Sequence, residues 1–218
     1  MDLKNKTIAF LGDSITQGTG ATEYKNCFVE VFSEIAGAKA LNYGISGTRI
    51  APQTKPSDEP AFDLDFIMRV PEMEENVDAV VVFGGTNDFG HGDAPFGEIT
   101  DTEAGTFCGA CDVLMRLLLN KYPSKPIVFV TPLHRLNENA TLNETGIECR
   151  ILADYVHAIK EKAEKYSIPV LDLFTASGMQ PDVEVQNKLY FADGLHPNDL
   201  GHERIAKMIK QFFEINIL

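Results

Sequence analysis

The apolar run from Ala79 to Phe83 limits most strongly how this chain can fold. Its residues, Ala-Val-Val-Val-Phe, show no alternation with polar residues, as is typical of a strand covered on both faces. Strands of that kind belong to parallel sheets with helices packed on either side. The run stops at Gly84-Gly85-Thr86-Asn87-Asp88, a polar cluster that predicts the end of the strand and a turn.

Strand-like and helix-like patterns alternate along the rest of the chain. We expect strands over residues 6–11, 38–43, 78–83, 126–130 and 168–173. We expect helices over residues 24–35, 62–70, 106–122, about 151–166 and 199–213, and irregular structure over 89–103. Such alternation produces right-handed crossovers and one parallel sheet between two layers of helices. With no internal repeat or linker, residues 1–218 are expected to form one domain.

Composition excludes several classes of partner. The formal net charge is −13, which disfavours binding to nucleic acid or to an anionic membrane and suits a neutral or cationic small molecule. The polar residues 1–6 and the short apolar run 8–11 do not resemble a secretory leader, so we expect a cytoplasmic protein. Composition does not predict the oligomeric state.

Two short motifs contain the residues of a nucleophilic hydrolase. Ser14 follows the strand-like run Ile8–Leu11, and Asp193 and His196 stand three residues apart near the other end of the chain. A serine hydroxyl is a weak nucleophile until a base takes its proton, and an imidazole can do so near neutral pH. A carboxylate can orient that imidazole and stabilise its cation. We therefore expect Ser14, His196 and Asp193 to act together in acyl transfer.

Acyl transfer also requires hydrogen-bond donors for the oxyanion that develops on the substrate. Asn87 offers an amide group at a predicted strand end, and Gly47 offers a backbone N–H without a side chain. The N–H of Ser14 can join them. Because these residues follow neighbouring parallel strands, we expect them to meet at one edge of the sheet.

Together these motifs resemble the four sequence blocks of the SGNH (GDSL-type) hydrolases, in the family's order and over nearly the whole chain. The matching stretches are Gly12-Asp13-Ser14-Ile15, Gly44-Ile45-Ser46-Gly47, Gly84-Gly85-Thr86-Asn87-Asp88 and Asp193-Gly194-Leu195-His196-Pro197. Ile15 replaces the leucine that usually ends the first block. The resemblance implies a flavodoxin-like, three-layer α/β/α fold with about five parallel strands. It also implies ester hydrolysis without a metal or other cofactor.

The same resemblance assigns a role to each motif residue. It makes Ser14 the nucleophile, His196 the base and Asp193 its orienting carboxylate. It places Ser14, Gly47 and Asn87 in the oxyanion hole. The chain is not an α/β-hydrolase of the G-x-S-x-G type, because Thr16 stands where the last glycine would be.

Other polar residues near the predicted strand ends are weaker candidates. Arg49, His91, His134 and Arg135 lie in loops at the expected active edge, where they either contact the substrate or are merely solvated. We expect Asp13, Asp88, Thr16 and Thr86 to be loop-bonding residues and not catalysts, and His157 and His202 to be solvated.

Three alternatives to a small-acyl esterase remain open. Within the family, long-chain acyl thioesters or lysophospholipids could be the substrates, in place of small acyl esters of sugars or other metabolites. The loop 16–22 faintly resembles the phosphate loop of flavodoxin, which would indicate a non-catalytic binding module. The pair Cys108 and Cys111 could form a redox site, or it could be two thiols in the first turns of a helix, one of them buried.

Overall fold

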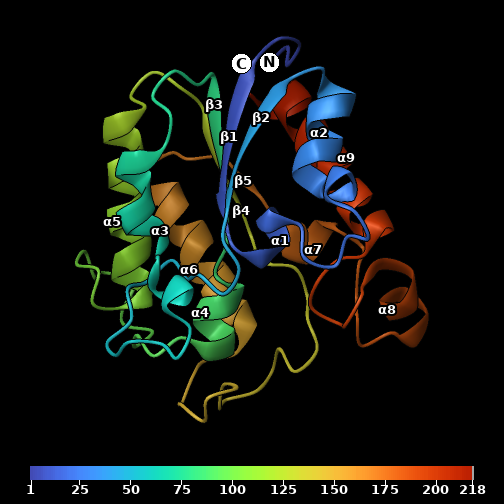
Figure 1. The fold of residues 1–218 in the computed structure, drawn as a ribbon. Helices are drawn as coiled ribbons and strands as arrows, with labels where there is room; N and C mark the ends of the chain where they lie inside the picture. Colours follow the sequence, from blue (N-terminus) through green and yellow to red (C-terminus); the bar gives the residue numbers. More distant parts are fainter. Residues whose placement is uncertain (218) are drawn as a thin grey trace.

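One parallel sheet forms the centre of the computed structural model, which describes residues 1–217 (Figure 1). Its strands are β1 (Thr7–Gly12), β2 (Lys39–Gly44), β3 (Ala79–Phe83), β4 (Ile127–Val130) and β5 (Val170–Leu171). They pair in the order β2-β1-β3-β4-β5, all parallel. This is the strand order of flavodoxin-like folds. The three-layer α/β/α fold expected from the sequence is confirmed.

Helices cover both faces of the sheet. The longer ones are α2 (Phe28–Ala36), α5 (Phe107–Lys121), α6 (Leu152–Lys165) and α9 (Asp199–Asn216). The shorter ones are α1 (Ser14–Gln17), α3 (Phe66–Arg69), α4 (Thr86–His91), α7 (Leu173–Ala176) and α8 (Glu184–Tyr190), with 3₁₀ turns at Tyr24–Asn26, Pro60–Asp63 and Val70–Glu72. α2 packs against α9 on one face, and α5 packs against α6 on the other (Figure 1).

The central strand β3 explains why its sequence is apolar throughout. Val81 and Phe83 belong to the core on the α2 and α9 side, with Phe28. Val80 and Val82 belong to the core on the α5 and α6 side. Because successive side chains of a strand point to opposite faces, a strand between two layers of helices needs apolar residues at every position.

Several predicted boundaries were wrong. The helix expected from Tyr24 begins at Phe28, because Cys27 has an extended backbone, and Tyr24 is 58% exposed in a 3₁₀ turn. The helix expected over 62–70 is broken, and Asp65 caps the short helix α3 by accepting the N–H of Met68. Residues 89–91 are helical although residues 89–103 were expected to be irregular. β5 has only two residues, and α7 and α8 were not predicted.

No helix within residues 1–217 combines the length and the apolar character that crossing a bilayer requires.

Candidate active site

Three of the predicted site residues, Ser14, Gly47 and Asn87, follow the carboxyl ends of β1, β2 and β3. Ser14 is the first residue of α1, directly after β1, and Gly47 lies in the segment after β2. Asn87 lies in the first turn of α4, after β3. β1 pairs with β2 on one side and with β3 on the other, so the chain crosses over β1 between them. Such a switch point is where open α/β sheets bind their ligands.

Ser14 is fixed by a tight turn between β1 and α1. Asp13 caps the helix, because its side chain accepts the N–H of Ile15 at 3.0 Å. Gly12 leaves room for the turn, since a Cβ atom there would lie 1.9 Å from Oγ1 of Thr16. As the first residue of the helix, Ser14 has an N–H without an acceptor inside that helix. Both the hydroxyl and the N–H of Ser14 therefore lie at the carboxyl edge of the sheet.

A chain of hydrogen bonds connects Ser14 to the loop between α8 and α9. Oγ of Ser14 lies 3.0 Å from Nε2 of His196, and Nδ1 of His196 lies 2.7 Å from Oδ2 of Asp193. Oδ1 of Asp193 also accepts the backbone N–H groups of His196 and Leu195. Partial burial raises the pKa of Asp193, but these hydrogen bonds outweigh it and lower the pKa overall. The structure thus places a carboxylate, an imidazole and a hydroxyl in series.

The loop 18–22 packs closely against His196 and Pro197. Gly20 has φ +94°, and a Cβ atom there would lie 2.2 Å from the carbonyl oxygen of Pro197. The N–H and the hydroxyl of Thr22 both donate to Asp199, at 2.8 and 2.6 Å. Asp199 therefore already accepts both hydrogen-bond donors of Thr22.

His202 is a correction to the sequence prediction. It was expected to be solvated, but its exposed fraction is 0%. Its Nδ1 accepts the N–H of Phe28 at 3.2 Å, and its Nε2 donates to the carbonyl of Thr19 at 3.1 Å. Burial lowers the pKa of His202 to about 4. The neutral imidazole thus ties the loop 18–22 to α2 and α9.

The segment 47–51 forms the other side of the site. Nδ2 of Asn87 donates to the carbonyl of Thr48 at 3.0 Å. The carboxylate of Asp88 accepts the N–H groups of Ile50 and Ala51 at 3.0 and 2.9 Å. Gly47 has φ +75°, which favours glycine. Two consecutive residues of α4 therefore hold the segment that presents the N–H of Gly47.

Arg69 also holds this region, and sequence reasoning missed it. Its guanidinium donates to the carbonyls of Tyr43 and Gly12 and to Oγ1 of Thr48, at 2.6, 3.1 and 2.9 Å. Burial lowers the pKa of Arg69 to about 10, so it stays charged at neutral pH. A lone arginine beside the apolar residues Phe66 and Val70 was the available signal. It connects the ends of β1 and β2.

The loop-bonding roles expected for Asp13 and Asp88 are confirmed. Burial raises the pKa of Asp13 to about 7 and that of Asp88 to about 6, and the nearby Asp88 adds to the shift of Asp13. Oγ1 of Thr86 lies 3.5 Å from the guanidinium of Arg135. The expectation for Thr16 was wrong, because its buried Oγ1 has no hydrogen-bond partner among the described residues. This hydroxyl packs against Gly12 instead.

A comparison with models of protein families identifies the family of this chain. The model of the GDSL-like Lipase/Acylhydrolase family matches residues 10–204. The chain belongs to this family. No curated protein matched the chain. The family supports acyl hydrolysis as the activity.

Solved structures share the fold of this chain. A protein from Lactobacillus plantarum is 30% identical, with 99% of each chain covered and a TM-score of 0.83. A member of the lipolytic protein G-D-S-L family from Veillonella parvula is 17% identical, with 96% of this chain and 98% of that one covered and a TM-score of 0.64. A two-domain esterase active on acetylated mannans is 20% identical, with a TM-score of 0.62, and the match covers 97% of this chain and 49% of the esterase. The last two likenesses show the fold alone.

Two of the four weaker candidates lie together beside the family motifs. The guanidinium of Arg49 lies 2.6 Å from Nδ1 of His91, and both residues line a cavity of about 440 Å³. Burial lowers the pKa of His91 to about 4, and the charge of Arg49 adds to this shift. The imidazole of His91 is therefore neutral at physiological pH.

The other two candidates make structural contacts outside that cavity's lining. His134 pairs with Glu138 at 2.8 Å, and its ring lies on that of Phe174. Arg135 is 7% exposed and donates to the carbonyl of Thr86 and to Glu144. The exposed position expected for His157 is confirmed.

The cysteine pair does not have the character of a redox site. Cys108 and Cys111 are both buried in α5, although only one was expected to be. Burial raises the pKa of Cys108 to about 11 and that of Cys111 well above its ordinary value. Reactive thiols need a lowered pKa and access to solvent. Within residues 1–217, no group of three or more His, Cys, Asp or Glu residues could hold a metal ion.

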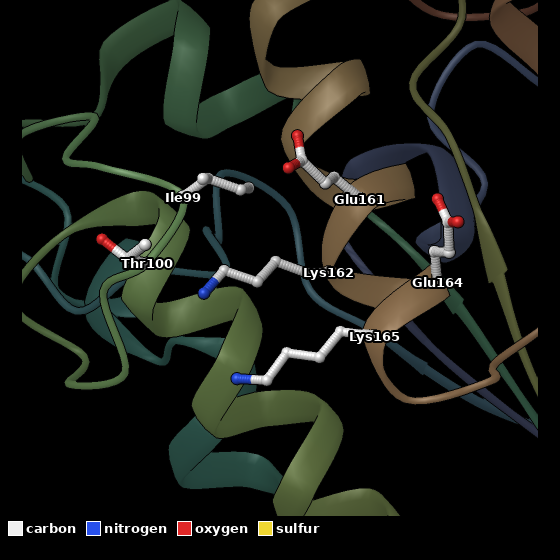
Figure 2. A pocket seen from close by; sticks show the side chains of 6 residues that line it. All are labelled: Ile99, Thr100, Glu161, Lys162, Glu164 and Lys165. Atoms are coloured by element: carbon white, nitrogen blue, oxygen red, sulfur yellow. The ribbon is translucent and has the colours of Figure 1, made fainter.

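A larger hollow, of about 690 Å³, lies away from Ser14. Figure 2 shows Lys162 and Lys165 reaching from the last turns of α6 beside Ile99 and Thr100. Both ammonium groups contact Asp112 of α5. Because α6 leads into the start of β5, this hollow lies toward the amino ends of the strands, opposite the family motifs. Both of its cationic side chains therefore already pair with Asp112.

Proposed function

We propose that this member of the family is a serine ester hydrolase that removes small, acetyl-like acyl groups from carbohydrates or other small molecules. The observation that carries the proposal is the hydrogen-bonded series of Ser14, His196 and Asp193, with separations of 3.0 and 2.7 Å. Nucleophile, base and orienting carboxylate lie within hydrogen-bond distance, as acyl transfer requires.

In the proposed mechanism, Nε2 of His196 takes the proton of Ser14 as Oγ attacks the ester carbonyl. Asp193 holds the imidazole with Nδ1 protonated and stabilises the cation that forms. His196 then returns the proton to the departing alcohol. In the second half, His196 activates water, which attacks the acyl-serine, and the acid leaves as Ser14 regains its proton.

Three donors would stabilise the oxyanion: the N–H of Ser14, the N–H of Gly47 and Nδ2 of Asn87. An amide nitrogen carries two hydrogens, and Asn87 gives one to the carbonyl of Thr48. The other stays available for the substrate. The same contact orients the amide group before substrate arrives, which is the preorganisation that electrostatic catalysis needs.

Hydrolysis of p-nitrophenyl esters of increasing chain length tests the proposal. We expect a burst of p-nitrophenol with the acetate the fastest substrate. Ser14→Ala should lower kcat by about 10⁴-fold or more without changing the folded structure, because Oγ forms the new bond. A mutant as active as the wild type would refute the nucleophile. Fastest turnover of a long-chain ester would favour the long-chain thioesterase or lysophospholipase alternative.

We further propose that residues 1–218 act as one cytoplasmic domain on a dissolved ester, without a nucleic acid or membrane partner. The net charge of −13 supports the part of this proposal that concerns nucleic acid and anionic membranes, because both are negatively charged. Fractionation of cells that express the chain, followed by vesicle and nucleic acid binding assays, tests it. Retention on anionic vesicles at physiological salt would contradict it.

A further inference from the structure

The cavity that Arg49 and His91 line begins beside the proposed oxyanion hole. Phe62 packs over Gly47 so closely that a Cβ atom on Gly47 would lie 2.1 Å from its ring. His91 lies one helical turn after Asn87 in α4. The rings of Phe62 and His91 have centroids 5.5 Å apart, and both rings line the cavity. A substrate bound at Gly47 and Asn87 would therefore extend into this space.

We propose that this cavity binds the part of the substrate beyond the scissile ester, and that it accepts neutral or cationic polyhydroxylated groups and rejects anionic ones. This inference rests on the proposed function, because it names the substrate class of the same site.

The lining combines apolar surface with many polar side chains, which suits a polyhydroxylated group better than an extended hydrocarbon. Its apolar side chains are Pro56, Phe62 and Ile147, and the remaining lining residues are polar or charged. A long acyl chain would remove those charged groups from water without giving them a partner, which is costly. A sugar ring can place its apolar face on Phe62 while its hydroxyls bond the polar residues. A volume of about 440 Å³ is within the range of small-molecule sites.

The cations of the cavity are largely neutralised. Arg49 lies 3.7 Å from Asp63, and its guanidinium also bonds Ser57 and His91. Glu144, another lining residue, pairs with Arg135 at 2.5 Å. A substrate carboxylate or phosphate would have to displace one of these partners to reach a guanidinium.

The unpaired groups of the lining leave an excess of negative charge. Among the lining residues that the structure describes, Asp58, Glu59 and Asp93 form no ion pair, although Asp93 is near enough to raise the pKa of Arg49, and Lys55 is the cation without an ion pair. His91 adds no charge, because its pKa is lowered to about 4 by burial and by Arg49. Like charges in a partly enclosed space repel, and salt screens that repulsion. The cavity should therefore select substrates by charge, most strongly at low salt.

Three acetylated methyl glycosides with the same ring size test the selection: a neutral hexoside, its 2-amino counterpart and its uronate. We expect kcat/KM for the neutral and amino esters to exceed that for the uronate at least ten-fold at low salt. The difference should shrink in high salt. Equal kcat/KM for the uronate and the neutral ester would overturn the proposal.

Charge reversal at the rim provides the matched comparison. Asp58 is exposed and makes no hydrogen bond in the described structure, so Asp58→Lys should fold normally. In this variant, the ratio of kcat/KM for the neutral ester to that for the uronate should fall several-fold. Glu34→Lys makes the same charge change at an exposed site on α2, on the other side of the sheet. A shift as large in Glu34→Lys as in Asp58→Lys would mean that the whole-protein field, not the cavity, selects the substrate.

Binding to the Ser14→Ala protein separates this inference from the proposed function. NMR titration of that protein with the unacetylated hexoside, amino sugar and uronate should give the weakest binding for the uronate. Shifts should occur at Phe62 and Ile147. If the native protein hydrolysed none of the esters but the order of binding were as expected, only the proposed hydrolase mechanism would be refuted. Shifts elsewhere, or tightest binding of the uronate, would refute the cavity assignment whatever the activity.

Discussion

The two sides of Ser14 are built with different degrees of burial. On the base side, the side chain of Asp193 is 54% exposed, and that of His196 is 17% exposed. On the oxyanion side, Asn87 and Asp88 are each 5% exposed, and the partly buried Arg69 braces the same segment. A base that exchanges protons benefits from access to water, whereas oxyanion donors act best when they are fixed and dry. Substitutions on the base side should therefore affect activity alone, and those on the oxyanion side should also affect stability.

The largest effect that tests this contrast belongs to Asp193→Asn. An asparagine keeps the shape but cannot hold the imidazole of His196 in the tautomer that accepts the proton of Ser14. We expect kcat to fall about 10³- to 10⁴-fold, with the free energy of unfolding nearly unchanged. Stopped-flow hydrolysis and urea unfolding measure the two quantities.

Asp199→Asn is the control for that substitution. Asp199 also accepts hydrogen bonds from a nearby loop, but it contacts Thr22 and Asn26 instead of His196. The Asp199→Asn variant should keep most of the wild-type kcat. If Asp193→Asn also unfolded at much lower urea than the wild type, the base side would be structural and the contrast would be lost.

Asn87→Ala should have the next largest effect. It removes a proposed oxyanion donor, which typically lowers kcat about 10²- to 10³-fold. It also leaves the carbonyl of Thr48 without its partner, at a cost of about 1–3 kcal/mol in stability. Steady-state kinetics and chemical denaturation should show both losses.

Asn42→Ala separates those losses. The Nδ2 group of Asn42 donates to the carbonyl of Thr16 at 2.8 Å, so this variant also loses an amide–carbonyl bond. It should lose stability but little kcat. Equal kcat in the two variants would exclude Asn87 as an oxyanion donor.

A smaller effect on rate, together with a clear one on stability, is expected for Asp88→Asn. The carboxylate accepts two backbone N–H groups, and an amide has only one acceptor oxygen. We expect a loss of about 1–3 kcal/mol in the free energy of unfolding and about a ten-fold lower kcat, because the segment 47–51 loosens. Asp78→Asn, which changes an acceptor at the amino end of the sheet, should leave kcat unchanged. Unchanged stability in Asp88→Asn would show that the segment does not depend on this carboxylate.

The sequence predicted the residues on the two sides of Ser14 only in part. Apolar strands followed by polar clusters predict the sheet and the shared edge, because the period of a strand and the ends of parallel strands are local properties. Ser14 and Asn87 could be placed in this way. Arg69 and His202 could not, because each bonds elements far away in the sequence, and burial of a polar side chain depends on tertiary packing. α4 was missed beyond its motif because Gly90 and Gly92 resemble a loop.

Acidification should change the stability of the two sides in opposite directions. His202, beneath the base side, has a pKa of about 4 against its ordinary value of 6.5. The stability linked to its neutral form is present above pH 6.5 and is lost as pH falls through 4, by about 3 kcal/mol at pH 4. Asp88, on the oxyanion side, has a pKa raised from 3.8 to about 6. Its contribution is full below pH 3.8 and is lost as pH rises through 6.

Urea unfolding at a series of pH values can separate these two contributions. His202→Gln should be less stable than the wild type at neutral pH, but it should lose less stability between pH 6.5 and 4. Asp88→Asn should lose more stability over the same range, because it lacks the carboxyl group whose protonation stabilises the folded state in acid. His157→Gln removes an exposed histidine and should leave the pH profile unchanged. If His202→Gln kept the full acid dependence, the buried imidazole would not link the base side to pH, and the acid sensitivity would have to come from carboxylates with a lowered pKa, such as Asp193 and Asp199.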